Sequence, residues 1–270
     1  MTLIGYPLTK AHRLTLAAAF RQAPRVDLSI DCVLEGQMGK AIVDQLESPH
    51  VFMLMVGPFA YLAGDPTGTA ATDVLQLLPP YNLLMPSTPG WAEAAQALFG
   101  PRLQSMDRYR VSHEQISQHK LVQIWQSSPH REIVRPIDRP LATSVWGQEH
   151  FLDLSIFDSV EDFLARGIGF SLMHGERLVG VAYSSLVCSR GIEISIFVKD
   201  DYRRQGMATA LASRLLLWCL ERGMEPHWDA ANPESLKACS EVGLPGPGRL
   251  SGLLSGRLMP GLSMPVTGIW

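Results

Sequence analysis

The sequence predicts a mixed fold of the α/β (α+β) class, in which a mainly antiparallel sheet is flanked by helices and preceded by a smaller α/β domain. Three patterns support this prediction. Apolar strands alternate with helical stretches in the first half, a hairpin pattern covers 170–186, and a strand, a glycine turn and a long helix occupy 192–220. We expect domains at 1–125 and 126–244, followed by a Gly/Pro/Leu-rich C-terminal tail at 245–270.

The composition is typical of a globular protein. The chain has 270 residues, a formal net charge of -3 and 18% charged residues, and its length suits one large or two modest domains. No basic run is long enough to indicate a nucleic-acid partner. The apolar runs at 51–56 and 215–220 are too short to span a bilayer, and no signal-peptide pattern follows Met1. We therefore expect no membrane partner and a cytoplasmic location.

The N-terminal domain is expected to pack against the second domain and to shape the acceptor site. Its strands are predicted at 26–34, 51–55 and 59–63 and its helices at 69–78 and 91–99, with proline and glycine at the breaks. Segment 36–40 carries two glycines at an expected helix start, so a second phosphate site there is a minor alternative. The junction between the domains is expected near 126–130, and no repeat is visible at solenoid periods.

The second domain is expected to start its sheet with a hairpin. A helix that ends near Gly167 precedes strands at 170–173 and 178–186, and a turn signal lies between them. A further strand at 192–198 continues the chain. Together they predict an antiparallel meander.

Residues 192–220 place a strand, a turn and a helix in an order that suits anion binding. The turn holds Gly206 and Ala208, whose small size leaves the main-chain amides open. The first amides of a helix have no intrahelical acceptor and lie at the positive end of its dipole. A strand near 227–231 completes a right-handed crossover, which puts the turn at the carboxyl end of the first strand. A diphosphate is expected there, with an ordinary structural turn as the alternative.

Two motifs in this domain resemble a known family. The pattern Arg-x-x-Gly-x-Ala at 203–208 resembles the acetyl-coenzyme A pyrophosphate signature of the GCN5-related N-acetyltransferases (GNAT). The block Trp-Asp-x-x-Asn-x-x-Ser at 228–235 is similar to the last block of that superfamily, in the form found in the branch of the zwittermicin A resistance acetyltransferase. The resemblance covers 131–244. It implies a GNAT-type sheet, acetyl-CoA as cosubstrate and a small amine as acceptor.

The resemblance also implies which residues bind acetyl-CoA. They are the end of the strand, the turn with its helix start, and two polar residues near the last helix: Ile196, Phe197, Val198, Arg203, Arg204, Gln205, Gly206, Met207, Ala208, Asn232 and Ser235. Main-chain N–H groups near Phe197 and Val198 are expected to face the thioester carbonyl as oxyanion donors. For Asn232, a helix cap is the alternative role.

Acetyl transfer needs a base, because an amine with a pKa of about 10 is protonated at neutral pH. Glu193 is the candidate base, since relatives that use a base often carry a Glu on this strand; a solvent-facing or salt-bridged strand residue is the alternative. Many relatives carry a Tyr seven residues after the helix-opening Asn, and this chain has Cys239 there. Cys239 is the candidate proton donor, with core packing as the alternative and Tyr183 as a substitute.

The end of the chain departs from the family pattern. Relatives add strands that complete the sheet, whereas Pro245 and Pro247 lead here into a stretch rich in glycine and leucine. Proline removes ladder donors and glycine weakens strand interiors. The final strands are therefore expected to be missing or poorly ordered, with an exposed sheet edge on the acceptor side.

These observations predict an acetyl-CoA-dependent N-acetyltransferase that acts on a primary amine of a small molecule, such as a metabolite or an aminated antibiotic. An acyl-CoA-binding sensor with weak or lost catalysis is the alternative from another class, and an enzyme for longer acyl chains is a third. The four cysteines form no Cys-x-x-Cys pair and no His-x-x-x-His pair occurs, so reduced core thiols and no metal are expected. The sequence leaves the oligomeric state open, with a homodimer among the options.

Overall fold

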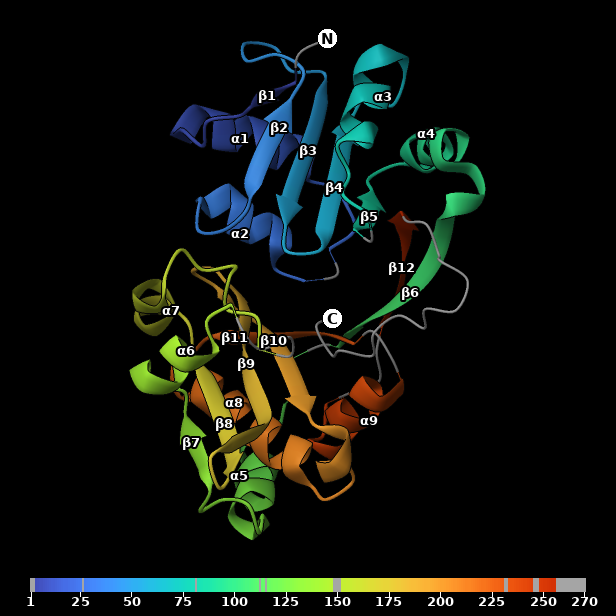
Figure 1. The fold of residues 1–270 in the computed structure, drawn as a ribbon. Helices are drawn as coiled ribbons and strands as arrows, with labels where there is room; N and C mark the ends of the chain where they lie inside the picture. The colour runs from blue at the N-terminus through green and yellow to red at the C-terminus, as the bar shows by residue number, and fades with distance from the viewer. Residues whose placement is uncertain are drawn as a thin grey trace. The chain divides into compact units, whose positions relative to one another are not determined.

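The computed structural model describes residues 3–25, 27–80, 82–111, 113–114, 116–147, 152–230, 233–244 and 248–255. Contacts divide the chain into two compact units, whose elements are labelled in Figure 1. Among the described residues, those up to Arg108 and those from Leu250 onward form unit 1, and those from Tyr109 to Arg249 form unit 2. The predicted boundary at 125/126 lies downstream of this division. No helix within the described ranges is long and apolar enough to cross a bilayer.

Six strands of unit 1 have the order β1-β2-β3-β4-β5-β12, in a sheet that continues from β12 to β6 (Leu103–Val111). The six strands are β1 (Ile4–Gly5), β2 (Lys40–Val43), β3 (Val51–Val56), β4 (Phe59–Gly64), β5 (Leu83–Pro86) and β12 (Gly248–Ser255). Neighbouring strands run antiparallel except β4 and β5, which are parallel.

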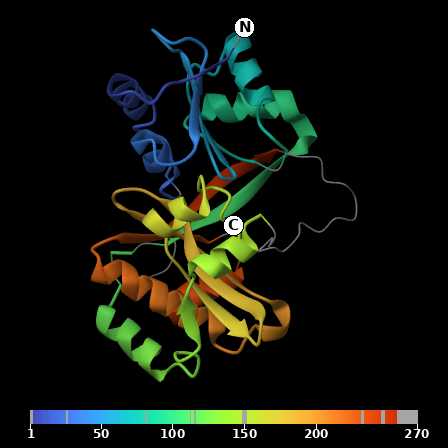
Figure 2. The ribbon, with the colours of Figure 1, turned by 60° about the vertical axis from the view of Figure 1, so that its left-hand side comes forward.

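Helices cover both faces of this sheet. Helices α1 (Lys10–Ala19) and α2 (Ser29–Glu35) lie on one side, and α3 (Gly68–Gln76) and α4 (Pro89–Phe99) lie on the other (Figure 2). A short 3₁₀ turn, η1 (Gly100–Arg102), follows α4. The core between the sheet and α3 and α4 contains the fully buried side chains of Met53, Leu62 and Trp91. These apolar side chains supply the burial that stabilises the unit.

Segment 36–40 lies at the end of a helix and not at the start of one. Gly36 ends α2 with φ 69°, and the segment leads into β2. Gly39 has φ 77°, and a Cβ there would lie 2.5 Å from the carbonyl oxygen of Met55. The expected helix start is therefore wrong, because left-handed glycines here stop a helix and allow a close backbone approach. The basis for a second phosphate site is lost with it.

The sheet of unit 2 has the strand order β6-β11-β10-β9-β8-β7. Its strands are β7 (Val134–Pro136), β8 (Gly169–His174), β9 (Arg177–Val187), β10 (Gly191–Val198), β11 (Glu225–Ala230) and the end of β6 (Leu103–Val111). Neighbours run antiparallel except β10 and β11, which are parallel. The predicted hairpin is β8 and β9, and the predicted mixed, mainly antiparallel α/β fold is confirmed.

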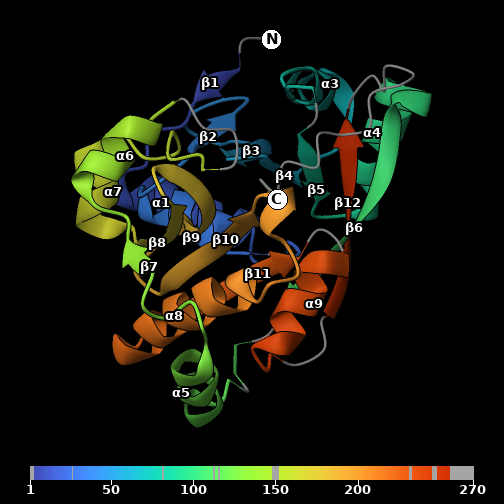
Figure 3. The ribbon, with the colours of Figure 1, turned by 60° about the horizontal axis from the view of Figure 1, so that its bottom comes forward.

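Helices again cover both faces. Helices α5 (Gln118–Ser127) and α8 (Met207–Glu221) lie on one side of the unit 2 sheet, and α6 (Arg139–Val145) and α7 (Val160–Arg166) lie on the other (Figure 3). The 3₁₀ turn η2 (Asp200–Tyr202) precedes α8, and α9 (Pro233–Glu241) follows β11. Helix α8 is the predicted long helix after the glycine turn. The four cysteines are buried thiols, as expected for core residues.

The two units repeat one order of elements. The first set runs from β1 to β6 and the second from β7 to β12. Each set has the order strand, two helices, three strands, helix, strand, helix, strand, and its fourth and fifth strands are parallel. The last strand of the first set, β6, pairs through its end with β11, and the last strand of the second set, β12, pairs with β5. The chain is thus a duplicated topology with exchanged final strands. This repeat was not visible in the sequence, because the two halves share the order of their helices and strands and not a recognisable pattern of residues.

The tail contributes a strand, contrary to expectation. Residues Leu253 and Leu254 of β12 pair with Leu84 and Leu83. The prolines at 245 and 247 precede this strand and remove no donor from it. Gly252 allows a close approach, since a Cβ there would lie 2.9 Å from the sulfur of Met85. The expectation that the final strands are missing is therefore wrong for 248–255; the remainder of the predicted tail lies outside the described residues.

Candidate functional site

The ladder between β10 and β11 opens after three residue pairs. Gly191, Ile192 and Glu193 pair with Glu225, Pro226 and His227. Beyond that point β10 stays paired with β9, while residues 228–230 pair with the end of β6. Two parallel strands that diverge in this way present main-chain groups that no longer bond to each other. An extended ligand can bond to such groups.

Glu193 lies where the two strands separate. Its side chain is buried, and Oε1 accepts a hydrogen bond of 2.7 Å from the main-chain N–H of Asp229. The carboxylate therefore bridges β10 and β11 at the last paired position. The solvent-facing alternative does not hold, because the residue is only 6% exposed.

The second predicted catalytic residue, Cys239, is buried. Burial raises the pKa of the Cys239 thiol, and the charge of Glu193 raises this pKa further. The thiol on α9 is therefore protonated at neutral pH and is a weak acid. Burial also raises the pKa of the substitute, Tyr183, to about 12, and its hydroxyl accepts a hydrogen bond from the main-chain N–H of Asp153.

The predicted phosphate turn has an open main chain. Arg204 has φ 60° and Gly206 has φ 78°, and α8 begins at the next residue, Met207. No side chain caps this helix start, and a Cβ added at Gly206 would meet nothing within 4 Å. The amides of the first turn of α8 thus face an unobstructed position where an anion can bind.

The two arginines of the turn differ in their surroundings. Arg203 is held by the turn itself: its Nε donates to the carbonyl of Val198 at 3.0 Å, and its guanidinium pairs with Asp200 at 2.9 Å. It also lies 5.8 Å from the ring centre of Phe197. Arg204 is exposed at the turn. Arg203 therefore shapes the turn, whereas Arg204 offers its charge to solvent.

Sequence reasoning missed one contact of this turn. His130 lies at the junction expected near 126–130, and its Nε2 lies 2.7 Å from the carbonyl oxygen of Gln205. This side chain connects the turn before β7 to the phosphate turn, although the two are distant in the sequence. No local pattern signals such a contact.

The remaining predicted cofactor residues fall into three groups. Ile196, Phe197 and Val198 lie at the end of β10, beyond the last pair with β11. The hydroxyl of Ser235 on α9 accepts a hydrogen bond of 3.0 Å from the indole N–H of Trp228. Asn232 lies outside the described residues.

The corresponding turn of unit 1 carries an acidic residue. It connects β4 to α3, as the phosphate turn connects β10 to α8. The Asp65 carboxylate accepts hydrogen bonds from the N–H and the hydroxyl of Thr67, at 2.9 and 2.7 Å, and these bonds lower its pKa. A negative charge thus lies just before α3. Helix α3, like α8, begins without a side-chain cap beside a left-handed glycine, Gly68, so the charge of Asp65 is what opposes an anion in unit 1.

Comparisons with known proteins agree with this geometry. Residues 19–246 match the family model described as GNAT acetyltransferase. A crystal structure of a GCN5-related N-acetyltransferase-like protein from Streptococcus suis 89/1591 is 28% identical, covers 90% of this chain and 97% of its own, and superposes with a TM-score of 0.77. A tandem GNAT protein from the clavulanic acid biosynthesis pathway covers 96% of this chain and 99% of its own at 11% identity, with a TM-score of 0.59, which indicates a shared fold.

A curated relative matches part of the chain. It is the uncharacterized N-acetyltransferase YdfB of Bacillus subtilis (strain 168), 25% identical over 162 residues. The alignment covers 59% of this chain and 60% of that protein. The narrower resemblance to the zwittermicin A resistance branch stays a prediction.

Proposed function

This chain belongs to the GNAT acetyltransferase family, and we propose that it is an acetyl-CoA-dependent N-acetyltransferase that acetylates a primary amine of a small molecule. The observation that carries the proposal is the opening of the β10–β11 ladder beside the bare turn at the start of α8. The first feature offers main-chain groups to an extended ligand, and the second offers amides to a diphosphate.

The residues of unit 2 fit acetyl-CoA in two places. The open amides at 206–208 and the exposed Arg204 suit the pyrophosphate. The end of β10, residues 196–198, suits the pantetheine arm and the thioester, with N–H groups near Phe197 and Val198 as donors to the developing oxyanion. Acetyl-CoA supplies the activated acetyl group, and the amine attacks it directly.

Glu193 is the proposed base. Its Oε1 is held by the N–H of Asp229, so the carboxylate has a fixed position at the point where the strands part. A carboxylate in this position can take a proton from the ammonium form of the acceptor, directly or through a water molecule. Cys239 stays the proposed proton donor, and its raised pKa predicts a small contribution to turnover.

A turnover assay tests the proposal. Purified protein is incubated with acetyl-CoA and a panel of small primary amines, and the free thiol of CoA is measured. Thiol release that depends on an amine, with an N-acetylated product by mass spectrometry, supports the enzyme. Absence of release with all amines contradicts it.

The acyl-CoA sensor is the second candidate, favoured by the buried, weakly acidic thiol at 239. A sensor is expected to gain thermal stability with acetyl-CoA while releasing no thiol. An enzyme is expected to show both effects. The third option is an enzyme that transfers longer acyl chains. Competition between acetyl-CoA and longer acyl-CoAs for binding tests it.

A further inference from the structure

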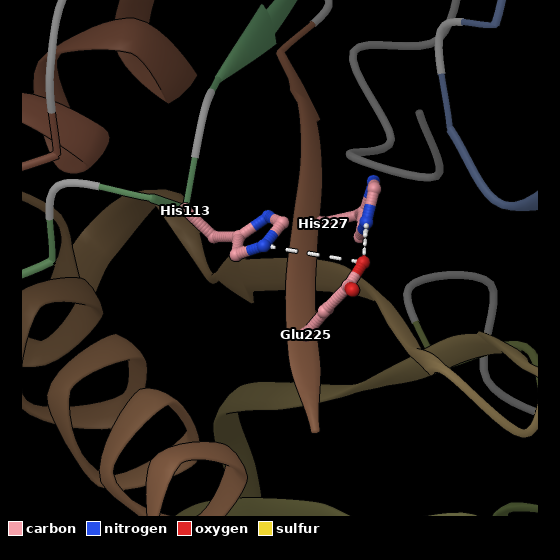
Figure 4. A group of neighbouring side chains, drawn as sticks. All are labelled: His113, Glu225 and His227. Atoms are coloured by element: carbon pink, nitrogen blue, oxygen red, sulfur yellow. Dashed lines mark hydrogen bonds and ion pairs between the residues drawn. The ribbon is translucent and has the colours of Figure 1, made fainter. Parts of the chain in front are cut away.

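Three metal-ligating side chains gather at the start of β11, at the closed end of the β10–β11 ladder. One donor atom each from His113, Glu225 and His227 lies within 4.8 Å of the other two (Figure 4). The Nε2 atoms of His227 and His113 lie 3.2 and 3.9 Å from Oε2 of Glu225. All three residues belong to unit 2.

The sheet brings these residues together. Glu225 and His227 are two positions apart on β11, so their side chains point to the same face. His113 comes two positions after Val111, which pairs with Trp228 in the antiparallel β6–β11 ladder. The sequence did not indicate the cluster, because its spacing matches no metal motif and its first member is distant in the chain.

We propose that His113, Glu225 and His227 bind one divalent transition-metal ion of the zinc class. Two imidazoles and a carboxylate are a donor set that Zn²⁺ takes with three protein ligands and an open fourth position. Donors around a tetrahedral Zn²⁺ with bonds of about 2.0–2.1 Å lie about 3.3 Å apart. The two imidazoles lie 3.2 and 3.9 Å from the carboxylate and within 4.8 Å of each other, so side-chain movements of up to about 1.5 Å reach this geometry.

Arg190 is the main competitor for the metal. Its Nε lies 2.7 Å from Oε2 of Glu225, and its side chain is 47% exposed. The guanidinium neutralises the carboxylate that the metal needs. Removal of the Arg190 guanidinium is therefore expected to strengthen metal binding. If the three residues form only an ion-pair network, the same change is expected to weaken the network.

The test uses the untagged full chain and Co²⁺, whose visible absorption reports ligand number, together with Zn²⁺ calorimetry. The wild type is expected to bind one equivalent. His113→Ala and Glu225→Gln are expected to lose about tenfold or more in affinity, and Arg190→Ala to gain affinity. His119→Ala, an exposed histidine on α5, is the matched control and is expected to bind as the wild type does.

The outcomes separate a metal site from an ion-pair network. Absence of one-equivalent binding by the wild type overturns the proposal, and so does equal affinity in wild type, His113→Ala and Glu225→Gln. His227→Ala is avoided as the primary variant, because its side chain is buried. A rise in melting temperature with Zn²⁺ in the wild type that His113→Ala lacks is the second readout, and it does not depend on acetyl transfer.

Discussion

At the residue scale, the position of Glu193 defines how the proposed base works. A buried carboxylate held by a main-chain N–H cannot rotate away, so its second oxygen has a fixed direction. Such a residue combines a structural contact with chemistry. A variant that keeps the contact with Asp229 and removes the base is needed to tell the two roles apart.

Glu193→Gln separates the two roles, because the amide oxygen still accepts from the N–H of Asp229. We expect turnover to fall by roughly 100- to 10,000-fold, with acetyl-CoA affinity nearly unchanged. The loss is expected to be largest at low pH, where the fraction of unprotonated amine is smallest. Rates over a pH series give the measurement, with exposed Glu176→Gln as the control; an unchanged profile removes Glu193 from the mechanism.

The contact of His130 with the phosphate turn is expected to support acetyl-CoA binding. Its bond to the carbonyl of Gln205 holds the phosphate turn, so His130→Ala is expected to weaken acetyl-CoA binding by roughly 2- to 10-fold, the worth of one hydrogen bond. Calorimetry measures the affinity. The variant His119→Ala should bind as the wild type does, and equal binding by both variants would mean that the contact does not order the turn.

The buried thiol of Cys219 is expected to lower the free energy of unfolding at high pH. Burial raises the pKa of its thiol from 9.0 to about 12, so between these values the unfolded chain loses a proton that the folded chain keeps. Stability from this group is present below pH 9 and decreases by about 1.4 kcal/mol per pH unit above it. Denaturant unfolding at pH 10 and 11, where the unfolded thiol is mostly ionised, measures the slope, which Cys219→Ala should reduce by about that amount.

At the element scale, α8 has left-handed glycines at both ends. Gly206 has φ 78° and Gly223 has φ 65°, and an added Cβ meets nothing within 4 Å at either position. A leucine at either site therefore has a similar backbone cost of about 1–2 kcal/mol. Only one of the two lies at the proposed phosphate position, which makes them a matched pair.

We expect Gly206→Leu to weaken acetyl-CoA binding by about tenfold or more, because the side chain blocks charged hydrogen bonds worth about 1.5–3 kcal/mol each. Gly223→Leu is expected to lose stability to a similar extent and to keep its affinity. Melting curves and calorimetry on both variants provide the comparison. Equal affinities would show that the diphosphate binds elsewhere.

At the scale of the whole molecule, the exchanged final strands make each unit depend on a distant part of the chain. Strand β12 covers β5, and without it the sheet of unit 1 ends in an unpaired edge. A chain ending at residue 247 is therefore expected to melt at least about 5 °C below one ending at residue 255. Circular dichroism measures both, and equal melting temperatures would mean that β12 contributes little.

Local patterns accounted for much of unit 2. The alternation in β10, the glycine before α8 and the apolar face of that helix depend on neighbours in the sequence, and each was predicted from them. Two local predictions failed in unit 1: the strand expected at 26–34 is helical over Ser29–Glu35, and the helix start expected at 36–40 follows that helix. The prediction for the tail failed because a distant strand decides the outcome. The tail was expected to lack strands because its composition is poor for them, yet β12 forms because β5 offers an open edge.

The sequence by itself determined the fold class, the family resemblance and the open turn at Gly206, since each follows from local periodicity and from the backbone freedom of glycine. Only the tertiary structure decided the rest. It placed Glu193 between two strands, set His130 against the turn, and gathered His113, Glu225 and His227. The physical reason is that burial, charge and ligand geometry depend on side chains that meet through sheet pairing, and strand register is not encoded in the spacing of the residues it joins.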